Sequence, residues 1–449
     1  MAELDAEETH AGDGSDAGST GGLYRVVGLG AQGDGLVREL DENGSLISGR
    51  AGIHVPFTLP GETVRLVTDA HAADGATGAT VEIVEAHAAR VDGVCPHFGT
   101  CGGCALQHVR DDFYTEWKSD LVRAAFAQRG LSPTFKPLIS VGLGARRRVT
   151  LTAVGGAPGE RPRVGFHASK SHDVIAITAC PVADPAITQL LPQLTDLVET
   201  LSPPRGGLRV HVLVADNGIC VDCEGFGRDL PATFRAKLAD RAEAMRLVRF
   251  TIDGDPVALR GVPHVTFGLA SVVPHPGAFL QAAKLAETVM SDAVVAALPK
   301  RAKRAADLFC GLGALTFPLA EMVGVFASDN APDALDALKA AQRDTQGLKK
   351  IDVLRRDLIQ DPLSRKELEP FELVVFDPPR SGAKEQAEAL AKSKVPVVVA
   401  VSCNPATLAR DVRILVDGGY EIESVQPIDQ FVFSPHVEAV VVLKRPLRR

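Results

Sequence analysis

Residues 305–317 read Ala-Ala-Asp-Leu-Phe-Cys-Gly-Leu-Gly-Ala-Leu-Thr-Phe, and this stretch decides the fold. It predicts a short buried strand, a Gly-x-Gly turn and then a helix. Gly311 and Gly313 allow the backbone to turn tightly and to approach a ligand closely. The segment 325–329 predicts the next strand, and the carboxylate of Asp329 at its end can accept both hydroxyls of a ribose. Helix and strand alternate from about residue 276 onward, which indicates an α/β domain with a doubly wound parallel sheet.

The Gly-x-Gly turn does not identify the ligand by itself, because binders of nicotinamide and flavin dinucleotides share the general plan. This chain lacks the third glycine of the dinucleotide fingerprint. Without a diphosphate to bind, S-adenosylmethionine becomes the favoured ligand. The sequence Asp-Pro-Pro-Arg at 377–380 follows another buried strand and favours it further.

A second reactive segment lies nearer the C-terminus. The apolar, mostly β-branched run 395–401 predicts a strand covered on both faces, and Cys403 follows it before the turn at Asn404 and Pro405. Open α/β sheets carry their chemistry at such carboxyl ends. Asp377 also follows an apolar run, and Glu438 ends the segment His-Val-Glu at 436–438. A thiol nucleophile with a nearby carboxylate base is the equipment for adding to an electron-poor ring and later removing its proton.

Together these segments resemble the RNA uracil-5 methyltransferase family. The motifs that carry the resemblance occur in the family's order and at similar spacing: Phe-Leu-Gln at 279–281, Asp-Leu-Phe-Cys-Gly-Leu-Gly at 307–313, Asp-Pro-Pro-Arg at 377–380, Ser-Cys-Asn-Pro at 402–405 and His-Val-Glu at 436–438. The resemblance implies a Rossmann-like class I methyltransferase domain. It also implies that Cys403 is the nucleophile and that Glu438 accepts the proton.

The resemblance further assigns the contacts with S-adenosylmethionine. They are Gln281, Phe309, Gly311, Gly313, Asp329, Asp357 and Asp377. Two departures from the family pattern put particular cofactor hydrogen bonds in doubt, but not the reaction. Ala314 and Ala283 stand where family members often carry asparagine.

The cysteine content points to a second centre. Eight cysteines and no secretory signal indicate a reducing compartment, which we expect to be the cytoplasm, and favour metal or catalytic roles over disulfides. Cys95, Cys101 and Cys104 share a Gly-rich loop, and Cys180 is a plausible fourth ligand. Four thiolates suit either an iron–sulfur cluster or tetrahedral zinc, and spacing alone does not separate these two. The pattern Cys-x5-Cys-Gly-Gly-Cys-x-x-Gln-His is similar to the [4Fe–4S] site of many family members.

Cys220 and Cys223 form a Cys-x-x-Cys pair, but their context predicts a strand after the turn 216–218. Residues three apart on a strand point to opposite faces, so we expect two buried thiols and no metal knuckle. Cys310 lies in the cofactor loop, where packing beside the ligand is favoured over catalysis.

Composition describes a globular chain of two or three domains, since 45% of the residues are hydrophobic and 23% charged. No apolar run approaches the roughly 20 residues of a membrane helix. Residues 1–22 contain six acids and no Lys or Arg, which predicts a disordered acidic tail. The net charge is −8, but removing the six acids of the tail from 56 leaves 50 acids against 48 bases. Local basic clusters such as 146–148 can then bind RNA phosphates.

Four segments follow from these patterns: the tail 1–22, a small β-domain at 23–90, a central α+β domain at 91–275 and the methyltransferase domain at 276–449. Short strands with Gly and Asn turns in 23–90 predict an OB-type barrel. Its segment Val-Pro-Phe-Thr-Leu-Pro-Gly-Glu at 55–62 resembles the RNA-binding TRAM domain. The central domain carries the cysteine site and, by expectation, RNA contacts.

We therefore expect a monomeric enzyme that transfers a methyl group from S-adenosylmethionine to C5 of a uridine in structured RNA, through a covalent bond between Cys403 and C6. The barrel and the cysteine site resemble the members that modify 23S ribosomal RNA, and transfer RNA is the alternative. An amino-methyltransferase remains a less favoured reading, because Arg380 replaces the aromatic residue of its acid-Pro-Pro-aromatic loop. A radical enzyme would use Cys-x3-Cys-x2-Cys, and a pure RNA-binding protein would need no Cys403.

Overall fold

The computed structural model describes residues 22–49, 51–67, 80–157, 159–204, 206–227 and 229–446. The described chain divides into two compact units, the first ending at Arg90 and the second beginning at Val91. Apart from Gly22, the expected acidic tail lies outside the described residues. Across these ranges, no helix combines the length and the apolar character needed to span a bilayer.

The first unit contains a five-stranded antiparallel sheet in the order β3-β2-β1-β4-β5. Inward-facing side chains, among them Val26, Val37 and Val64, form its small core. Alternation of buried and exposed residues along short strands explains this arrangement, because successive side chains of a strand point to opposite faces. The strands are β1 (Leu23–Leu29), β2 (Gly35–Glu39), β3 (Ile53–Val55), β4 (Thr63–Val67) and β5 (Thr80–Glu85).

A buried acid fixes the turn between β3 and β4. Glu62 is fully buried and accepts hydrogen bonds from the backbone N–H of Leu59 and from the Arg90 guanidinium at 2.6 and 2.7 Å. Burial alone would raise the pKa of Glu62, but the Arg90 side chain and the backbone donors outweigh it and lower that pKa. The segment with the TRAM-like sequence is thus held by a buried ion pair.

The second unit begins with a seven-stranded sheet in the order β13-β12-β11-β10-β7-β8-β9. Apolar side chains of α2 and α3 cover one of its faces. Cys220 and Cys223 both lie buried on β11, but they belong to different apolar clusters, as expected for side chains three residues apart on a strand. The elements are β7 (Arg148–Val154), β8 (Arg163–His167), β9 (Val174–Ala176), α2 (Pro185–Leu201), β10 (Leu208–Ala215), β11 (Gly218–Glu224), α3 (Ala232–Ala244), β12 (Arg249–Ile252) and β13 (Asp255–Leu259).

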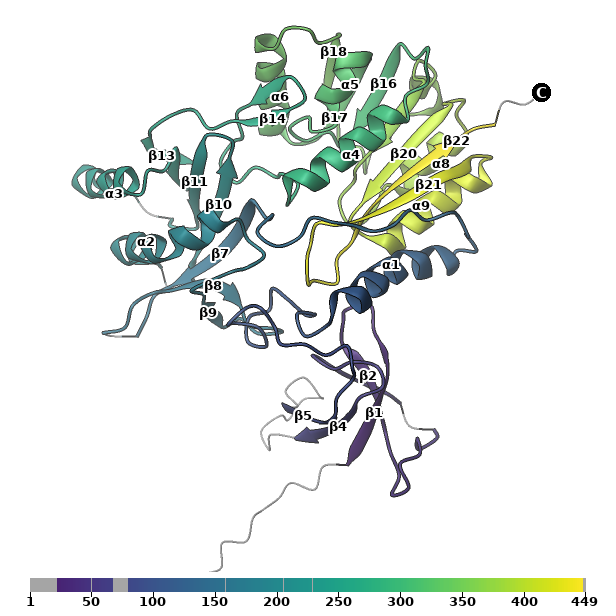
Figure 1. The fold of residues 1–449 in the computed structure, drawn as a ribbon. Coiled ribbons are helices and arrows are strands. Elements are labelled where there is room, and N and C mark those ends of the chain that lie inside the picture. Colours follow the sequence, from purple (N-terminus) through teal and green to yellow (C-terminus); the bar gives the residue numbers. More distant parts are fainter. Residues whose placement is uncertain are drawn as a thin grey trace, which may run out of the picture. The chain divides into compact units, whose positions relative to one another are not determined.

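The second sheet of this unit has eight strands in the order β18-β17-β16-β19-β20-β22-β21-β6. The first five are mutually parallel, whereas β22 runs antiparallel to both of its neighbours. Figure 1 shows this sheet with helices on both faces. Its strands are β16 (Arg304–Leu308), β17 (Gly324–Asp329), β18 (Ile351–Arg355), β19 (Leu373–Phe376), β20 (Val397–Ser402), β21 (Glu421–Asp429), β22 (Glu438–Lys444) and β6 (Ile139–Ser140).

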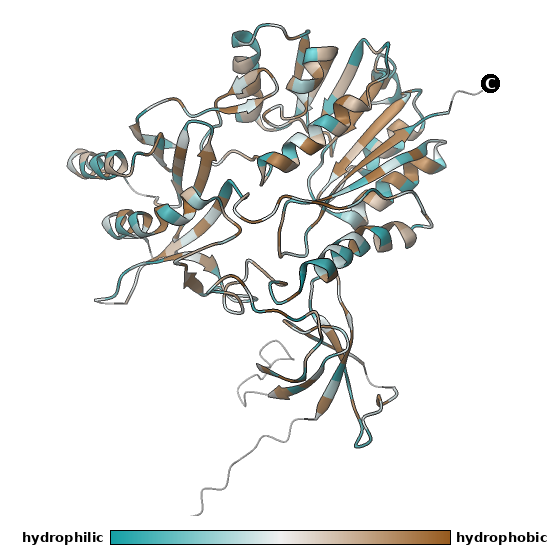
Figure 2. Ribbon diagram, in the orientation of Figure 1, coloured by the Kyte–Doolittle hydropathy of each residue, from teal (hydrophilic) through white to brown (hydrophobic). Residues whose placement is uncertain are grey.

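Two apolar clusters cover the two faces of this sheet. One includes side chains of α4, α5 and α6, and the other includes side chains of α1, α8 and α9. Hydrophobic residues colour the central strands almost continuously in Figure 2, as parallel strands buried on both faces require. The remaining elements are α1 (Asp111–Ala127), β14 (Val265–Phe267), β15 (Ala270–Val272), α4 (Lys284–Ala296), α5 (Thr316–Met322), α6 (Pro332–Asp344), α7 (Arg365–Leu368), α8 (Lys384–Ala391) and α9 (Pro405–Asp417).

Two elements from the segment 91–275 belong to the packing of the eight-stranded sheet. The short strand β6 pairs with the edge strand β21, and α1 packs its Val122 and Phe126 into the same cluster as α9. The segment that leads to α1 contains the cysteine loop. The fold therefore brings the cysteine loop and the C-terminal sheet into one compact unit.

Candidate active site

The carboxyl ends of the five parallel strands meet at one edge of the sheet. Phe309 follows β16, Asp329 ends β17, Asp377 follows β19 and Cys403 follows β20. The sheet order reverses between β16 and β19, and open α/β folds bind their ligands at such a switch point. The predicted cofactor and catalytic segments thus share one edge.

The loop after β16 adopts the tight conformation that its glycines predict. Gly311 and Gly313 have φ angles of 51° and 94°, and a Cβ added at Gly313 would approach the Phe317 ring to 2.8 Å. Phe309 also has a positive φ of 63°, a conformation that is unfavourable for a residue with a side chain. Residues in such conformations are found most often at functional sites. The backbone N–H of Gly311 donates to Asp329 at 2.9 Å, so the acid at the end of β17 helps to hold this loop.

One buried acid in this region was missed by the sequence reasoning. Asp307 lies inside β16 and accepts a hydrogen bond from the Thr316 hydroxyl at 2.6 Å. Burial is the largest cause that raises the pKa of Asp307 to about 7, and Asp377 and Asp329 add to it. The sequence signal that could have identified Asp307 is its position within an otherwise apolar strand. Aspartate is rarely buried unless its carboxylate has a partner.

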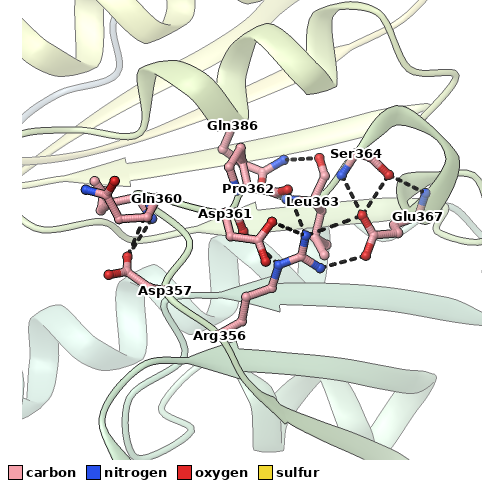
Figure 3. A network of polar contacts seen from close by, with 10 residues as sticks. Arg356, Asp357, Gln360, Asp361, Pro362, Leu363, Ser364, Glu367 and Gln386 are labelled. Carbon is pink, nitrogen blue, oxygen red and sulfur yellow. Dashed lines mark hydrogen bonds and ion pairs between the residues drawn. The ribbon is translucent and has the colours of Figure 1, made fainter.

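The loop after β18 presents Asp357 on a rigid support. Its carboxylate accepts from the backbone N–H groups of Ile359 and Gln360 at 3.0 and 3.3 Å. The neighbouring Arg356 is held by ion pairs with Asp361 and Glu367 (Figure 3). Asp357 itself is exposed.

A chain of side-chain amides connects the predicted carboxylates. The Gln281 amide donates to Asp377 at 3.0 Å. The Gln430 amide donates both to Gln281 Oε1 and to Glu438 Oε2, each at 2.8 Å. Asp377 and Glu438, which lie 61 positions apart in the chain, are therefore joined through two glutamines. Gln430 was not identified from the sequence, because a lone glutamine in a loop carries no pattern.

The two carboxyl groups of this chain have perturbed acidities. Burial is the largest cause that raises the pKa of Glu438, followed by the nearby Asp377, while the Gln430 hydrogen bond opposes the shift. Burial likewise raises the pKa of Asp377. Among the described residues, Glu438 Oε1 is buried and has no hydrogen-bond partner. A buried carboxylate with one free oxygen and a raised pKa has the properties of a general base.

Cys403 lies half-buried between β20 and α9. Burial raises the pKa of its thiol, the charges of Glu438 and Asp377 raise it further, and Arg380 opposes them. The Asn404 side chain caps α9 by accepting from the Ala406 N–H at 3.1 Å, and it donates to the Arg380 carbonyl at 3.0 Å. The Asp-Pro-Pro-Arg and Ser-Cys-Asn-Pro loops are thereby fixed against each other.

Arg380 also reaches the loop that precedes Glu438. Its guanidinium donates to His436 Nε2 at 2.8 Å. Burial lowers the pKa of His436 to about 4, and the positive charge of Arg380 lowers it further. His436 is therefore neutral at pH 7 and acts as an acceptor toward Arg380. The reactive thiol, the carboxylates and a guanidinium converge at one place.

The four predicted metal ligands influence one another electrostatically, but among the described residues they do not form a closed ligand set. Cys95, Cys101, Cys104 and Cys180 are half-buried free thiols. Burial is the largest cause that raises the pKa of the Cys104 thiol to about 12, and the other three thiolates add to it, which places all four within electrostatic reach. Within the parts of the chain that the structure describes, no three His, Cys, Asp or Glu side chains are grouped closely enough to hold a metal ion.

Comparison with known proteins adds an independent finding. A sequence model of the tRNA (uracil-5-)-methyltransferase family matches residues 274–446. An uncharacterized RNA methyltransferase of Caulobacter vibrioides is 42% identical, and the match spans 94% of this chain and 99% of the relative. The 23S rRNA (uracil(1939)-C(5))-methyltransferase RlmD of Shewanella halifaxensis is 31% identical, over 91% of this chain and 94% of the relative. The chain belongs to the RNA (uracil-5-)-methyltransferase family. The enzyme class that the motifs predict is thereby confirmed.

A solved structure supports the fold of this family member. The tRNA (uracil-54, C5)-methyltransferase of Pyrococcus abyssi, in complex with S-adenosyl-L-homocysteine, matches with a TM-score of 0.71 at 21% identity. The match covers 94% of this chain and 99% of that structure. The expected α/β architecture with a methyltransferase domain is therefore confirmed. The use of S-adenosylmethionine by the family agrees with the ligand that the loop after β16 favours.

One residue of the basic run 146–148 has partners within the protein. Arg147 is buried in an ion pair with Glu287 and also donates to the Gln281 carbonyl, so its guanidinium is not presented at the surface. Arg148 lies over the ring of Phe279 at 4.9 Å from its centre, and this ring is 67% exposed. The half-buried Arg148 therefore supports an exposed aromatic ring two residues before Gln281.

A buried lysine holds the loop that leads to Glu438. Lys118 of α1 has no exposed surface and donates to Asp429 at 2.7 Å, to the Phe431 carbonyl at 3.2 Å and to the His436 carbonyl. Tyr114 donates to the same aspartate at 2.6 Å. The loop between β21 and β22 is thus fastened to α1 immediately before Glu438.

Proposed function

We propose that this enzyme transfers a methyl group to C5 of a uridine in structured RNA through a covalent bond between Cys403 and C6. The observation that carries the proposal is the convergence of Cys403, Asp377 and Glu438 at the sheet edge that also bears the Gly-x-Gly loop. S-adenosylmethionine supplies the methyl group from its sulfonium sulfur. The family membership of the chain supports this reaction over transfer to an amino group.

Each catalytic side chain has one task in this proposal. The Cys403 thiolate adds to C6 and makes C5 nucleophilic enough to accept the methyl group. Glu438 Oε1 then removes the C5 proton, after which the thiolate leaves. Arg380 stabilises the thiolate, since it lowers the pKa of Cys403 against the opposing effect of burial.

The residues around the Gly-x-Gly loop fit the donor of the methyl group. Gly311 and Gly313 supply the positive φ angles of the turn, and Asp329 lies at the end of the adjacent strand, where a ribose would be bound. We assign the contacts with the donor to the residues that the motifs predict: Gln281, Phe309, Gly311, Gly313, Asp329, Asp357 and Asp377. Asp377 then lies between the donor and the uracil.

We further propose that Cys95, Cys101, Cys104 and Cys180 hold a [4Fe–4S] cluster. The four free thiols lie within electrostatic reach of one another, and the Cys101 sulfur accepts from the Gly103 N–H at 3.4 Å. Backbone donors to cysteine sulfur are a common feature of iron–sulfur sites, where they tune the cluster. The cluster would be structural, because the residues proposed for catalysis lie elsewhere.

The RNA target follows by analogy with named relatives. One relative is named for a uridine of 23S ribosomal RNA and a structural neighbour for a uridine of transfer RNA. We favour ribosomal RNA, with the antiparallel β-domain at 23–90 as a TRAM-type RNA-binding module and the cytoplasm as the compartment. A stacked uridine must leave its helix to reach Cys403, and the exposed Phe279 ring offers a surface for an unstacked base.

The test uses RNA that carries tritium at C5 of uridine. Wild-type enzyme with S-adenosylmethionine should release tritium, and 5-methyluridine mapping in both RNA classes should locate the target. Cys403→Ala should form no covalent protein–RNA species and should lose activity by on the order of a thousandfold or more, because it removes the nucleophile. Glu438→Gln should accumulate methylated RNA bound through Cys403. Cys223→Ala serves as the thiol control and should keep both activities, because Cys223 packs among apolar side chains on β11.

Either of two results would contradict these roles. One is tritium release by Cys403→Ala at the wild-type rate. The other is normal turnover by Glu438→Gln, since glutamine has similar size but cannot accept the proton. RNA with 5-fluorouridine at the target should trap wild type in the same covalent form, because fluorine cannot leave as a proton does.

A further inference from the structure

The loop between β21 and β22 contains one side chain, Gln430, that bonds both to Gln281 and to Glu438. Gln430 is 1% exposed. Its side-chain amide makes three hydrogen bonds within the protein. Its oxygen accepts from the Ala282 N–H at 3.0 Å, and its nitrogen donates to Gln281 and to Glu438 at 2.8 Å each. This geometry fixes which end of the amide carries the nitrogen.

The fixed orientation determines the direction of every hydrogen bond in the chain. Because the Gln430 oxygen already accepts from a backbone N–H, only its NH2 group is available to Glu438 and Gln281. Gln281 must then use its oxygen toward Gln430 and its NH2 group toward Asp377. Both carboxylates therefore receive a donor, and a hydrogen bond to the charged form favours ionisation.

The two oxygens of Glu438 are consequently different. Oε2 is occupied by Gln430, whereas Oε1 has no partner among the described residues and is buried. A carboxylate anchored through one oxygen presents the other in a single direction. Without the anchor, a buried glutamate would be free to change rotamer and would be more readily protonated.

We propose that Gln430 is a positioning residue for proton removal: it anchors Glu438 through Oε2, aims Oε1 at the C5 proton and ties this base to the Gln281–Asp377 pair. The inference rests on the function proposed above. In the step concerned, the C5 proton passes to Glu438 Oε1 and the C5–H electron pair forms the C5–C6 double bond. The C6–S bond breaks, and its pair returns to the Cys403 sulfur as thiolate.

The acidity of Glu438 gives a readout that a purely structural role would not move. The titratable groups that face Glu438 are Asp377 and the Cys403 thiol, and Arg380 lies beside that thiol. Burial is the largest cause that raises the pKa of Glu438, and Asp377 is the second. The Gln430 hydrogen bond lowers the pKa of Glu438. Loss of this donor must therefore shift the ionisation of the base to higher pH.

The experiment compares Gln430→Met, which has similar length and no donor, with Gln426→Met as a matched control. Gln426 lies on β21 and donates to the Pro137 carbonyl at 2.7 Å, away from the site. In single turnovers of tritiated RNA, Gln430→Met should form the covalent species at near the wild-type rate. Its tritium release should fall roughly 10- to 100-fold, the effect expected for losing a hydrogen bond to a charged group. The acid limb of release should move up by about one pH unit.

The outcomes separate this inference from the function on which it rests. If wild type neither forms a covalent species nor releases tritium, the proposed function is wrong. If wild type does both while Gln430→Met slows the two steps equally, or keeps the wild-type pH profile of release, the role of Gln430 is wrong. Should Gln430→Met fail to fold, Gln430→Asn keeps an amide but is one methylene shorter, and the same comparison applies.

Discussion

The catalytic edge and the cysteine loop are built on opposite principles. At the catalytic edge, which we define as Gln281, Asp377, Gln430 and Glu438, each polar side chain is oriented by another through hydrogen bonds of 2.8 to 3.0 Å. In the cysteine loop, at residues 95–104, the reactive groups are thiols. Thiols are weak donors and weak acceptors, and they cannot orient one another in this way. The side chains of the first site are oriented by their own hydrogen bonds, whereas the proposed cluster would have to orient the thiols of the second.

The two regions are nevertheless connected. The backbone N–H groups of Ala105 and Leu106, directly after Cys104, donate to the Phe433 carbonyl at 2.8 and 3.2 Å. Phe433 has a positive φ of 62° and belongs to the loop that leads to Glu438. The cysteine loop is therefore hydrogen-bonded directly to the loop that leads to the proposed base. A change in either region should be measurable in the other.

The largest effect should come from breaking the cysteine loop. Anaerobically purified wild type should be brown and contain iron and acid-labile sulfide, whereas Cys180→Ser should lose essentially all of both, because one of four thiolate ligands is missing. Thermal unfolding should occur at lower temperature, since binding of a structural metal centre contributes to folding free energy. Iron and sulfide analysis, absorbance and calorimetry measure these changes.

Cys223→Ser is the matched control for that experiment. Cys223 is a buried thiol of the seven-stranded sheet and packs among apolar side chains on β11. Its substitution should leave the iron content unchanged. Zinc in place of iron in protein never exposed to air would overturn the cluster assignment.

The next effect should come from breaking the fastening between α1 and the catalytic loop. Lys118→Met leaves the buried Asp429 carboxylate without its cation, and such a loss costs about 3–5 kcal/mol. Burial lowers the pKa of Lys118, but its ion pair with Asp429 opposes this, so the pair depends on both partners. Urea unfolding should show the loss in the free energy of unfolding, and tritium release should slow because the loop before Glu438 is loosened.

The control for this prediction is an exposed ion pair. Lys384 and Glu388 lie 3.7 Å apart on the surface of α8, and such pairs contribute about 0.3–0.5 kcal/mol. Lys384→Met should therefore change stability little. A Lys118→Met protein as stable as this control would show that the buried pair does not hold the loop.

The same contrast explains what could be predicted from the sequence. The parallel sheet, its switch point and the positions of Cys403 and Asp377 follow from local patterns: apolar runs, a Gly-x-Gly turn and the residues that end each strand. The five strands of the first unit follow from alternation and turn residues in the same way. These signals are contained within segments of about ten residues, so a single sequence is enough to recognise them.

The remaining features depend on contacts between distant segments, which no local pattern records. Gln430 and Lys118 are ordinary residues in a loop and a helix, and they matter because of partners 149 and 311 positions away. The pairing of β6 with β21 and the packing of α1 on α9 likewise join distant parts of the chain. Arg147 shows the converse error, because its basic neighbours predict an RNA contact and its actual partner is a buried glutamate.

The smallest effect concerns how the free energy of unfolding depends on pH. We expect Asp377 and Glu438 of the catalytic edge to contribute to this dependence. Burial raises the pKa of both Asp377 and Glu438 in the folded protein, and the charge of Asp377 raises the pKa of Glu438 further. In the unfolded chain these carboxyls titrate at about pH 4. The folded protein thus holds protons that the unfolded chain releases, and this stabilisation is complete below about pH 4 and is lost as the pH rises through the raised values.

Glu438→Gln removes one of these titrations without removing bulk. Between about pH 5 and pH 7, the free energy of unfolding of wild type should fall more steeply with pH than that of the variant, by at most about 1.4 kcal/mol per pH unit. Chemical denaturation at closely spaced pH values measures the two slopes, and Glu388→Gln on α8 should follow wild type. Parallel slopes for wild type and Glu438→Gln would mean that Glu438 has no raised pKa in the free enzyme. The acid limb proposed for proton removal would then have to arise from Asp377 or from the Cys403 thiol.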